Sequence, residues 1–171
     1  KKTKLSAYSN PRKKGIYAVE IREGDKLIEA RVSTGENDIL LGTRNGKSIR
    51  FSEEQIRPSG RKTMGVKGIT LSSADDKVVG MLLIKREGTV LVATENGYGK
   101  RTEIAQYRAQ KRGGKGVLTV KTTDKIGKMI TIKEVVGTDD LMIIRDDGVL
   151  IRMPVSQIRS IGRATQGVRL I

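Results

Sequence analysis

The fold is decided by the stretch Ile39-Leu40-Leu41-Gly42-Thr43-Arg44-Asn45-Gly46-Lys47-Ser48-Ile49-Arg50-Phe51, together with two later copies of it. In this stretch two β-rich runs flank Asn45-Gly46, and an Asn-Gly pair in that place favours a type I′ turn with positive φ at both central residues. The copies span Val90–Thr102 around Asn96-Gly97 and Leu141–Met153 around Asp147-Gly148. Each copy therefore predicts an antiparallel β-hairpin.

The hairpins belong to a repeat of 51 residues, and self-similarity at such a period decides the architecture before any local pattern does. Six columns of identical residues keep this spacing: Gly46/Gly97/Gly148, Arg50/Arg101/Arg152, Arg57/Arg108/Arg159, Arg61/Arg112/Arg163, Gly65/Gly116/Gly167 and Val66/Val117/Val168. A partial earlier copy precedes them, because Lys1–Tyr8 is similar to Lys100–Tyr107. The repeats run approximately over 1–35, 36–86, 87–137 and 138–171, the last of them incomplete.

Each repeat predicts about four short strands. After the hairpin comes a longer loop that ends in Gly65–Leu71 or its equivalents, and then a further apolar run: Lys26–Val32, Val78–Ile84 and Met129–Val135. Four strands in a repeat of this length are typical of blade-type β architecture, and no stretch has the pattern of a long helix. We expect one all-β domain over 1–171, built as an incomplete arc of about three to four blades that is either part of a larger ring or open.

The composition points to a polyanionic partner. The chain carries 34 Lys and Arg against 19 Asp and Glu, a net charge of +15, with four Tyr, one Phe and no Trp. Single-stranded nucleic acid is usually held by stacking on aromatic rings, so this scarcity favours a duplex gripped through its phosphates. No apolar run is long enough to span a bilayer, and we expect no membrane partner.

No catalytic centre can be assembled from the residues present. The chain has neither Cys nor His, which removes thiolate chemistry and the commonest general base and metal ligand. Asn96–Thr102 contains a Gly-Lys pair without the glycine spacing of a P-loop. The paired aspartates, such as Asp75-Asp76, fall at expected turns and lack the spacing of a calcium loop.

One loop differs from its siblings. Gln110-Lys111-Arg112-Gly113-Gly114-Lys115-Gly116 stands where the other repeats have Gly60–Gly65 and Gly162–Gly167. Arg112 and Gly116 are shared, which favours structural roles for them, whereas Lys111, Lys115, Gly113 and Gly114 are additions. Extra cations beside glycines could bring side chains and backbone N–H groups to a phosphate, because glycine removes the Cβ that would hold the ligand away.

The basic patch extends beyond this loop, to Lys100, Arg101, Arg108 and Lys121. Alternation along a strand places Lys100 and Arg101 on opposite faces. For the Arg50/Arg101/Arg152 and Arg57/Arg108/Arg159 columns two interpretations stay open, rim contacts to phosphate or pairing with acids such as Glu53, Asp146 or Asp147. The candidate DNA-binding residues are Gln110, Lys111, Arg112, Gly113, Gly114, Lys115, Gly116, Lys100, Arg101, Arg108, Arg61, Arg163, Arg50 and Arg152.

The heptad Gln110–Gly116 resembles the basic box of the C-terminal domains of bacterial DNA gyrase A subunits, matching the pattern Q-[K/R]-R-G-G-[K/R]-G at every position. The segments Asn96–Thr102, Gly60–Ile69 and Gly162–Ile171 also resemble repeats of that domain. The resemblance implies a β-pinwheel whose basic rim bends and wraps duplex DNA, in support of ATP-dependent negative supercoiling. In the family the principal box lies in the first repeat, so this heptad is either that box or a second copy.

The resemblance also implies partners and surroundings. Strand passage, with its ATP, Mg²⁺ and cleaving tyrosine, would lie in other domains of the gyrase A subunit, and in the B subunit of an A2B2 assembly, so we expect no cofactor in this chain. The location would be cytoplasmic, at the nucleoid. Two alternatives stay open: the related domain of topoisomerase IV, whose box is degenerate or absent, and a propeller-type scaffold for an acidic protein.

Overall fold

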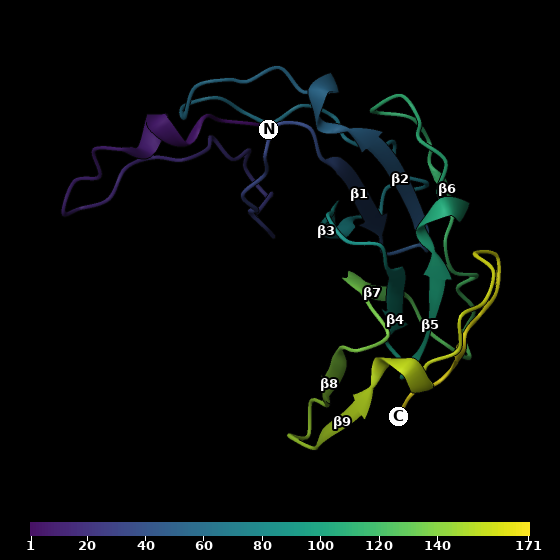
Figure 1. Ribbon diagram of the computed structural model, residues 1–171. Helices are drawn as coiled ribbons and strands as arrows, with labels where there is room; N and C mark the ends of the chain where they lie inside the picture. Colours follow the sequence, from purple (N-terminus) through teal and green to yellow (C-terminus); the bar gives the residue numbers. More distant parts are fainter.

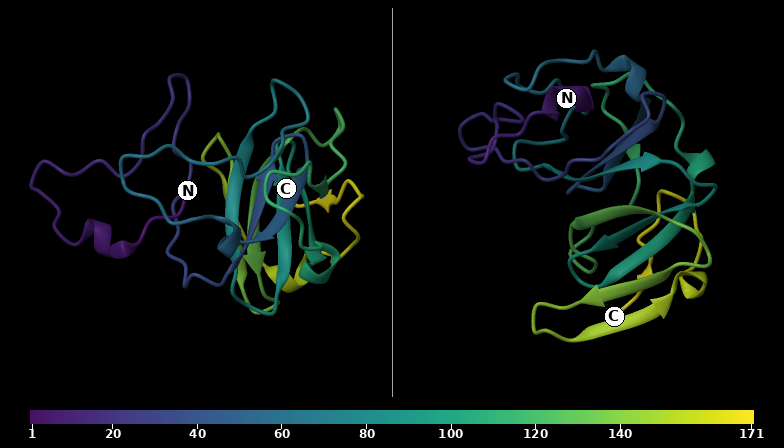
Figure 2. Two further views of the ribbon diagram at one scale, coloured as in Figure 1. Left: turned by 90° about the horizontal axis from the view of Figure 1, so that it is seen from above. Right: turned by 60° about the vertical axis from the view of Figure 1, so that its left-hand side comes forward.

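The computed structural model describes residues 1–171 and shows an open arc of β-sheets that stand side by side (Figure 1). Two sheets have four strands and a third has two, and the only helices are short 3-10 turns. The all-β prediction is confirmed. The N-terminal segment extends away from the sheets, as the view from above shows (Figure 2).

The first two sheets have the same plan. Blade 1 has the strand order β3-β1-β2-β6 and blade 2 the order β10-β5-β4-β7, which is the same plan read from the other side, while blade 3 is the hairpin β8-β9. The strands are β1 (Asp38–Thr43), β2 (Lys47–Ser52), β3 (Val78–Ile84), β4 (Thr89–Thr94), β5 (Tyr98–Glu103), β6 (Val117–Leu118), β7 (Met129–Val135), β8 (Asp140–Ile144), β9 (Leu150–Pro154) and β10 (Val168–Arg169). The 3-10 turns are η1 (Leu5–Tyr8), η2 (Glu53–Gln55), η3 (Ile104–Gln106) and η4 (Val155–Gln157).

The outer strand of each complete blade comes from the following repeat. β6 pairs with β2 through Ser48 and Val117, and β10 pairs with β5 through Gly99 and Val168, which are equivalent pairs one repeat apart. Beyond these strands Arg50 bridges Ala109, so the exchanged segment continues along the edge of the blade. Consecutive blades are therefore joined by backbone hydrogen bonds as well as by side-chain packing.

The hairpins lie where the sequence predicts them, but the prediction of type I′ turns is wrong. Gly46, Gly97 and Gly148 have φ of 82°, 75° and 86°, and no residue other than glycine has positive φ. In the first hairpin the Gly46 N–H donates to Thr43 O at 2.9 Å. The loop between β1 and β2 has three residues, one more than the two-residue loop of a type I′ hairpin. A three-residue loop of this kind places a type I turn before a single left-handed residue, so only the glycine needs positive φ.

The strand predicted at Lys26–Val32 is not formed, whereas β3 and β7 form at the equivalent positions Val78–Ile84 and Met129–Val135. β3 pairs with β1 and β7 pairs with β4, so this strand depends on the first hairpin strand of its own repeat. For Lys26–Val32 the equivalent hairpin strand corresponds to positions before Lys1. Within residues 1–171 no strand pairs with Lys26–Val32, and Leu27, Ile28 and Val32 are exposed.

The core lies between the blades, because strands in the arc are covered on both faces. Leu40 of blade 1 packs with Val90, Val92 and Met129 of blade 2, in the largest of three apolar clusters. Leu91, on the other face of β4, packs with Val155 and Ile158 of blade 3. Four consecutive residues of β4, Val90 among them, are buried for this reason. Alternation of apolar and polar residues is accordingly lost in the middle of the arc.

A buried carboxylate anchors the connection into blade 1. Glu53 is 1% exposed and accepts hydrogen bonds from the Ser33 hydroxyl at 2.6 Å, the Gly35 N–H at 2.9 Å and the Asn37 N–H at 2.8 Å. Burial alone would raise the pKa of Glu53, but these hydrogen bonds and the charge of Lys2 outweigh burial and hold the pKa below its ordinary value of 4.5.

A carboxylate with a lowered pKa stabilises the fold above its unfolded pKa, and the stabilisation is lost as pH falls through the folded pKa. We predict that Glu53→Gln lowers the free energy of unfolding at pH 7 by about 1–3 kcal/mol, since charged hydrogen bonds are replaced by neutral ones. The variant should also lose the share of the fall in stability below pH 4.5 that Glu53 contributes, whereas Asp76, Glu95 and Asp139, whose pKa values are lowered too, keep theirs. Urea unfolding between pH 3 and 7 measures both, with Glu54→Gln, an exposed neighbour in the same turn, as the control; equal pH profiles for the two variants would contradict the role of Glu53.

Candidate nucleic-acid interface

The heptad loop lies against the preceding repeat. The Gln110 N–H donates to Arg50 O, the Gly113 N–H to Gly68 O and the Thr70 N–H to Gly114 O, each at 2.8 Å. These three backbone bonds place the loop along the edge of blade 1, just before the exchanged strand β6. The loop is thus a rigid part of the junction between two blades.

The glycines of the loop serve this close approach. Gly116 has φ of 69°, and a Cβ on it would lie 2.4 Å from Ser48 O, so no other residue fits there. The N–H groups of Gly113 and Gly114 donate within the protein, to Gly68 O and Lys111 O, which contradicts a phosphate cradle built on these two groups. The backbone N–H groups of Lys115 and Gly116 have no acceptor in the protein.

Arg112 fastens the loop instead of projecting from it. Its guanidinium donates to Lys67 O at 2.5 Å and to Gln55 O at 3.3 Å. Arg61 donates in the same way to Tyr17 O at 3.0 Å, and Arg163 to Leu118 O at 2.8 Å. The structural role expected from the sibling loops is therefore present in all three repeats, and these guanidinium groups are partly used before any ligand arrives.

Lys121 of the predicted basic patch is exposed and its side chain has no partner. In the heptad loop and the repeated arginine columns, five further cations remain free: Lys111, Lys115, Arg57, Arg108 and Arg159. All five side chains are exposed and none makes a hydrogen bond or ion pair within the protein. Each arginine of the column comes two residues after a 3-10 turn, at the same place in successive repeats. Pairing with Glu53, Asp146 or Asp147 was one interpretation of this column, and the structure contradicts it.

The second arginine column is held within the protein. Arg50 donates to Asp38 at 2.8 Å, Arg152 donates to Asp140 at 2.8 Å, and Arg101 donates to Ile158 O at 2.8 Å. Arg50 is half-buried and also donates to Tyr107 O at 3.2 Å in the next repeat. Arg50 and Arg101 therefore contribute to contacts between blades, whereas Arg152 pairs within its own hairpin. The partners of the column differ from Glu53, Asp146 and Asp147, the acids expected from the sequence.

Lys100 is completely buried and does not lie on the basic surface. Its ammonium group donates to the carbonyls of Gly162 and Arg163 and to the Thr165 hydroxyl, all in the following loop. Burial lowers the pKa of Lys100 to about 8, and the charge of Arg163 adds to that effect. An ammonium group that is fully enclosed and bonded in this way is not free to contact a ligand.

Lys1 makes the same contacts as Lys100, but with the loop that contains Gly60 and Arg61. The heptad loop of the central repeat has no such lysine. Lys1 donates to Gly60 O at 2.8 Å and Arg61 O at 2.6 Å, as Lys100 does to the equivalent carbonyls. At the central position the residue is Ile49, whose Cδ1 would lie 3.5 Å from a Cβ on Gly114. We call the bonds from Lys100 to the loop that contains Thr165, and the equivalent bonds from Lys1 to the loop that contains Thr63, the Lys–Thr clamp. At the heptad loop the equivalent residues are Ile49 and Gly114. The column Lys1/Ile49/Lys100 carried this signal in the sequence, unnoticed beside the invariant columns.

The chain is similar to DNA gyrase proteins over its whole length. A profile of the family described as "DNA gyrase C-terminal domain, beta-propeller" matches residues 1–34, 37–85, 88–135 and 139–171. The DNA gyrase A subunits of Staphylococcus epidermidis and Staphylococcus aureus are each 47% identical to it over 173 residues. The alignments cover 100% of this chain, which spans 19% of the length of these curated relatives.

Solved structures share the fold. The C-terminal domain of DNA topoisomerase IV superposes with a TM-score of 0.92 at 22% identity, covering 99% of this chain and 53% of that chain. A DNA gyrase A C-terminal domain superposes with a TM-score of 0.86 at 23% identity, covering 93% of this chain and 54% of that one. The fold is therefore the β-pinwheel that the family resemblance implies, and it agrees with the blade-type architecture expected from the repeat.

The Lys–Thr clamp gives a prediction about stability. Lys100→Ile alone should cost about 1–3 kcal/mol, because two carbonyls and a hydroxyl lose a charged donor. Adding Thr165→Gly recreates the Ile49–Gly114 pair, so the double variant should be more stable than the sum of the single effects predicts. Urea unfolding of the four proteins in the cycle measures this coupling. Strictly additive effects would mean that the two positions are independent.

Proposed function

Because the chain belongs to the family of DNA gyrase C-terminal domains, we propose that it binds duplex DNA without sequence specificity and bends and wraps the duplex along the outer side of the arc. It would do so as part of the A subunit of a DNA gyrase, supporting ATP-dependent negative supercoiling by strand passage carried out elsewhere in the enzyme. The chain spans 19% of the length of the curated gyrase relatives, so the rest of the A subunit, together with the B subunit in an A2B2 assembly, belongs to this proposal.

The observation that carries the proposal is the set of free cations on the rim, Lys111, Lys115, Arg57, Arg108 and Arg159. Bending 20–30 base pairs smoothly costs about 1–6 kcal/mol, so a wrapping surface needs several phosphate contacts to offset it. A cation repeated once in each blade supplies contacts at intervals along a curved path. The heptad loop adds two more charges at the junction of blades 1 and 2.

The surroundings follow from the same proposal. ATP and Mg²⁺ would be used by other domains of the enzyme, and the chain would act in the bacterial cytoplasm at the nucleoid. None of the helices in the structure has the length and apolar character needed to cross a bilayer.

A second candidate is the corresponding domain of topoisomerase IV, which the fold alone supports through the TM-score of 0.92. The heptad Gln110–Gly116 and the 47% identity to gyrase A subunits favour gyrase. A scaffold for an acidic protein is the candidate from another class. Duplex binding and bending on random-sequence DNA at low and moderate salt distinguishes these classes, because a protein scaffold would show no salt-sensitive binding of duplex.

The loop is tested by its free lysines alone, since Arg112 has a structural role. We predict that Lys111→Ala with Lys115→Ala weakens duplex binding and reduces the slope of log K against log salt by about 1.8, from roughly 0.9 per phosphate contact. Thermal unfolding should stay unchanged because neither side chain has a partner in the protein. An unchanged slope would exclude both lysines as phosphate contacts.

The arginine column is tested separately. We predict that Arg57→Gln, Arg108→Gln and Arg159→Gln, combined, reduce the same slope by about 2.7, again at roughly 0.9 per contact, and also reduce DNA bending measured by energy transfer between the duplex ends. Each single variant should contribute about one third. Lys13→Gln, on the N-terminal segment away from the blades, serves as the charge control. A loss of slope equal to that of the control would contradict a per-blade contact.

A further inference from the structure

A cleft of about 450 Å³ opens beside blade 2, away from the heptad loop. Its walls come from three places: the connection before β4, the end of β5 with η3, and the connection after β7. The polar groups that line it include Arg86, Thr89, Arg101 and Glu103, and apolar side chains such as Ile104 and Val135 form the rest. The proposed DNA contacts do not use this cleft.

Comparison with the other two blades shows that an acid is missing from this place. In blade 1 Asp38 pairs opposite Ser52 and lies diagonally across from Arg50, and the two side chains form an ion pair at 2.7 Å. In blade 3 Asp140 and Arg152 form the same pair. The register of β4 and β5 is identical, with Thr89 opposite Glu103 and Leu91 opposite Arg101. Blade 2 therefore has Thr89 where its siblings have a carboxylate that neutralises the arginine.

Arg101 is arranged differently as a result. Arg50 uses its Nε and one terminal nitrogen for Asp38, and the other terminal nitrogen for the carbonyl of Tyr107. Arg101 uses Nε for the equivalent carbonyl, Ile158 O, at 2.8 Å, and both of its terminal nitrogens lack a partner in the protein. A pair of terminal guanidinium nitrogens is the fork that binds the two oxygens of a carboxylate or phosphate side by side.

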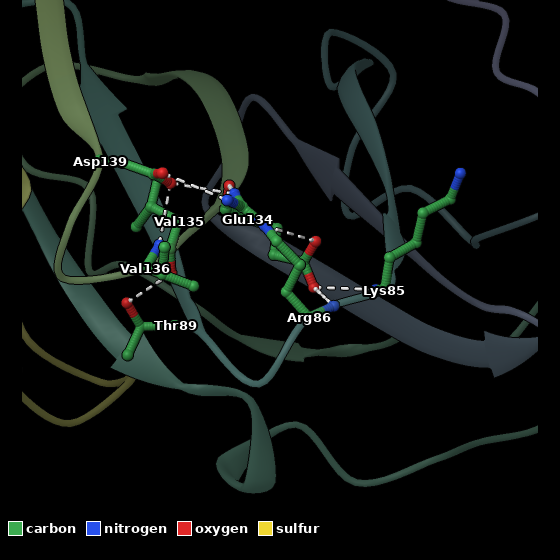
Figure 3. Close-up of polar contacts among 7 residues, drawn as sticks. All are labelled: Lys85, Arg86, Thr89, Glu134, Val135, Val136 and Asp139. Carbon is green, nitrogen blue, oxygen red and sulfur yellow. Dashed lines mark hydrogen bonds and ion pairs between the residues drawn. The ribbon is translucent and has the colours of Figure 1, made fainter.

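The other charges around the cleft are already engaged or lie at its margin. Arg86 is held by Asp139 at 3.0 Å and by Glu134, and the Glu134 carboxylate also accepts from the backbone N–H groups of Lys85 and Arg86 (Figure 3). Glu103 accepts from the Ser160 hydroxyl at 3.1 Å and forms no ion pair with Arg101. Glu87 is exposed. Thr89 donates to Val135 O at 3.4 Å, so its hydroxyl does not satisfy the arginine either (Figure 3).

We propose that this cleft binds a single carboxylate, from an Asp or Glu of an acidic peptide segment on a protein partner, with Arg101 as the residue that holds it. The arginine fork, left free only in blade 2, gives the charge complementarity, and the sibling aspartates show that a carboxylate on a peptide chain fits this geometry. The apolar walls suit the aliphatic part of a peptide. A duplex is too wide to enter a cleft of about 450 Å³, and Glu87 and Glu103 disfavour a polyanion there.

The experiment occupies the Arg101 guanidinium with a carboxylate supplied by the protein itself. Thr89→Asp should place a carboxylate on Arg101 as in blades 1 and 3, whereas Thr89→Asn has nearly the same shape without the charge. Ser156→Asp, at an exposed position of η4, changes the net charge equally elsewhere. The probe is a C-terminally amidated octapeptide of Gly and Ala with one central Asp and an uncharged fluorophore, so that it offers the cleft a single carboxylate, with its affinity measured by fluorescence anisotropy at moderate salt.

We expect Thr89→Asp and Arg101→Gln to weaken peptide binding about tenfold or more, the effect of losing one charge-assisted bidentate contact. Thr89→Asn and Ser156→Asp should stay within about twofold of the wild type, and Thr89→Asp should raise the melting temperature by completing the ion pair. Duplex affinity, measured in parallel, should respond alike to Thr89→Asp and Ser156→Asp.

Three results would overturn the proposal. Equal losses of peptide affinity in Thr89→Asp and Ser156→Asp would mean diffuse attraction to a basic protein. A wild type that does not bind the peptide would leave the cleft without this ligand. A loss of duplex affinity in Arg101→Gln without loss of peptide affinity would make Arg101 a phosphate contact, which is the role first predicted for it from the sequence.

Discussion

The sheet of every complete blade includes one strand that comes from the following repeat of the sequence. β6 and β10 each close the sheet of the preceding blade, and the segments around them contribute the bridges from Arg50 to Ala109 and from Arg101 to Ser160. An open sheet edge is a row of unpaired backbone groups, so the exchange satisfies that edge and fixes the position of the next blade in one step. The loop that carries the extra lysines is the connection to β6, and its position is therefore set by the same hydrogen bonds.

This arrangement explains why so many cations are unavailable to a ligand. The exchanged segment brings loop carbonyls against the neighbouring blade, and buried carbonyls need donors. Lys1, Lys100, Arg61, Arg112 and Arg163 supply them from side chains. The net charge of +15 thus has two components, one that joins the blades and one that faces outward. Only the second, represented by Lys111, Lys115 and the Arg57/Arg108/Arg159 column, can respond to salt as a DNA-binding surface does.

The sequence predicted the architecture well because the repeat supplied its own control. The hairpins, the long-period spacing and the strands β3 and β7 follow from apolar runs and Asn-Gly or Asp-Gly pairs that occur at matching positions. Local pattern failed where pairing depends on distant segments. Lys26–Val32 has the composition of a strand, but the hairpin strand equivalent to its partner corresponds to positions outside residues 1–171. The hairpin loops have one residue more than predicted, and only Gly46 and its equivalents adopt positive φ. The two-residue strands β6 and β10 are defined by their partners alone.

The sequence singled out the heptad loop but could not tell which repeated cations are engaged within the protein and which stay free, because residues that are invariant across the repeats can have either role. Arg50, Arg101 and Arg152 form one invariant column, yet two of them pair with an aspartate and the third does not. What distinguishes Arg101 is the residue diagonal to it, Thr89 against Asp38 and Asp140, and that relation is visible only once the register of β4 and β5 is known. The same holds for Ile49, which is informative because lysine occupies the equivalent place in the repeats on either side. In a repeat protein the departures from the pattern, read together with their structural neighbours, therefore say more about specialised sites than the invariant columns do.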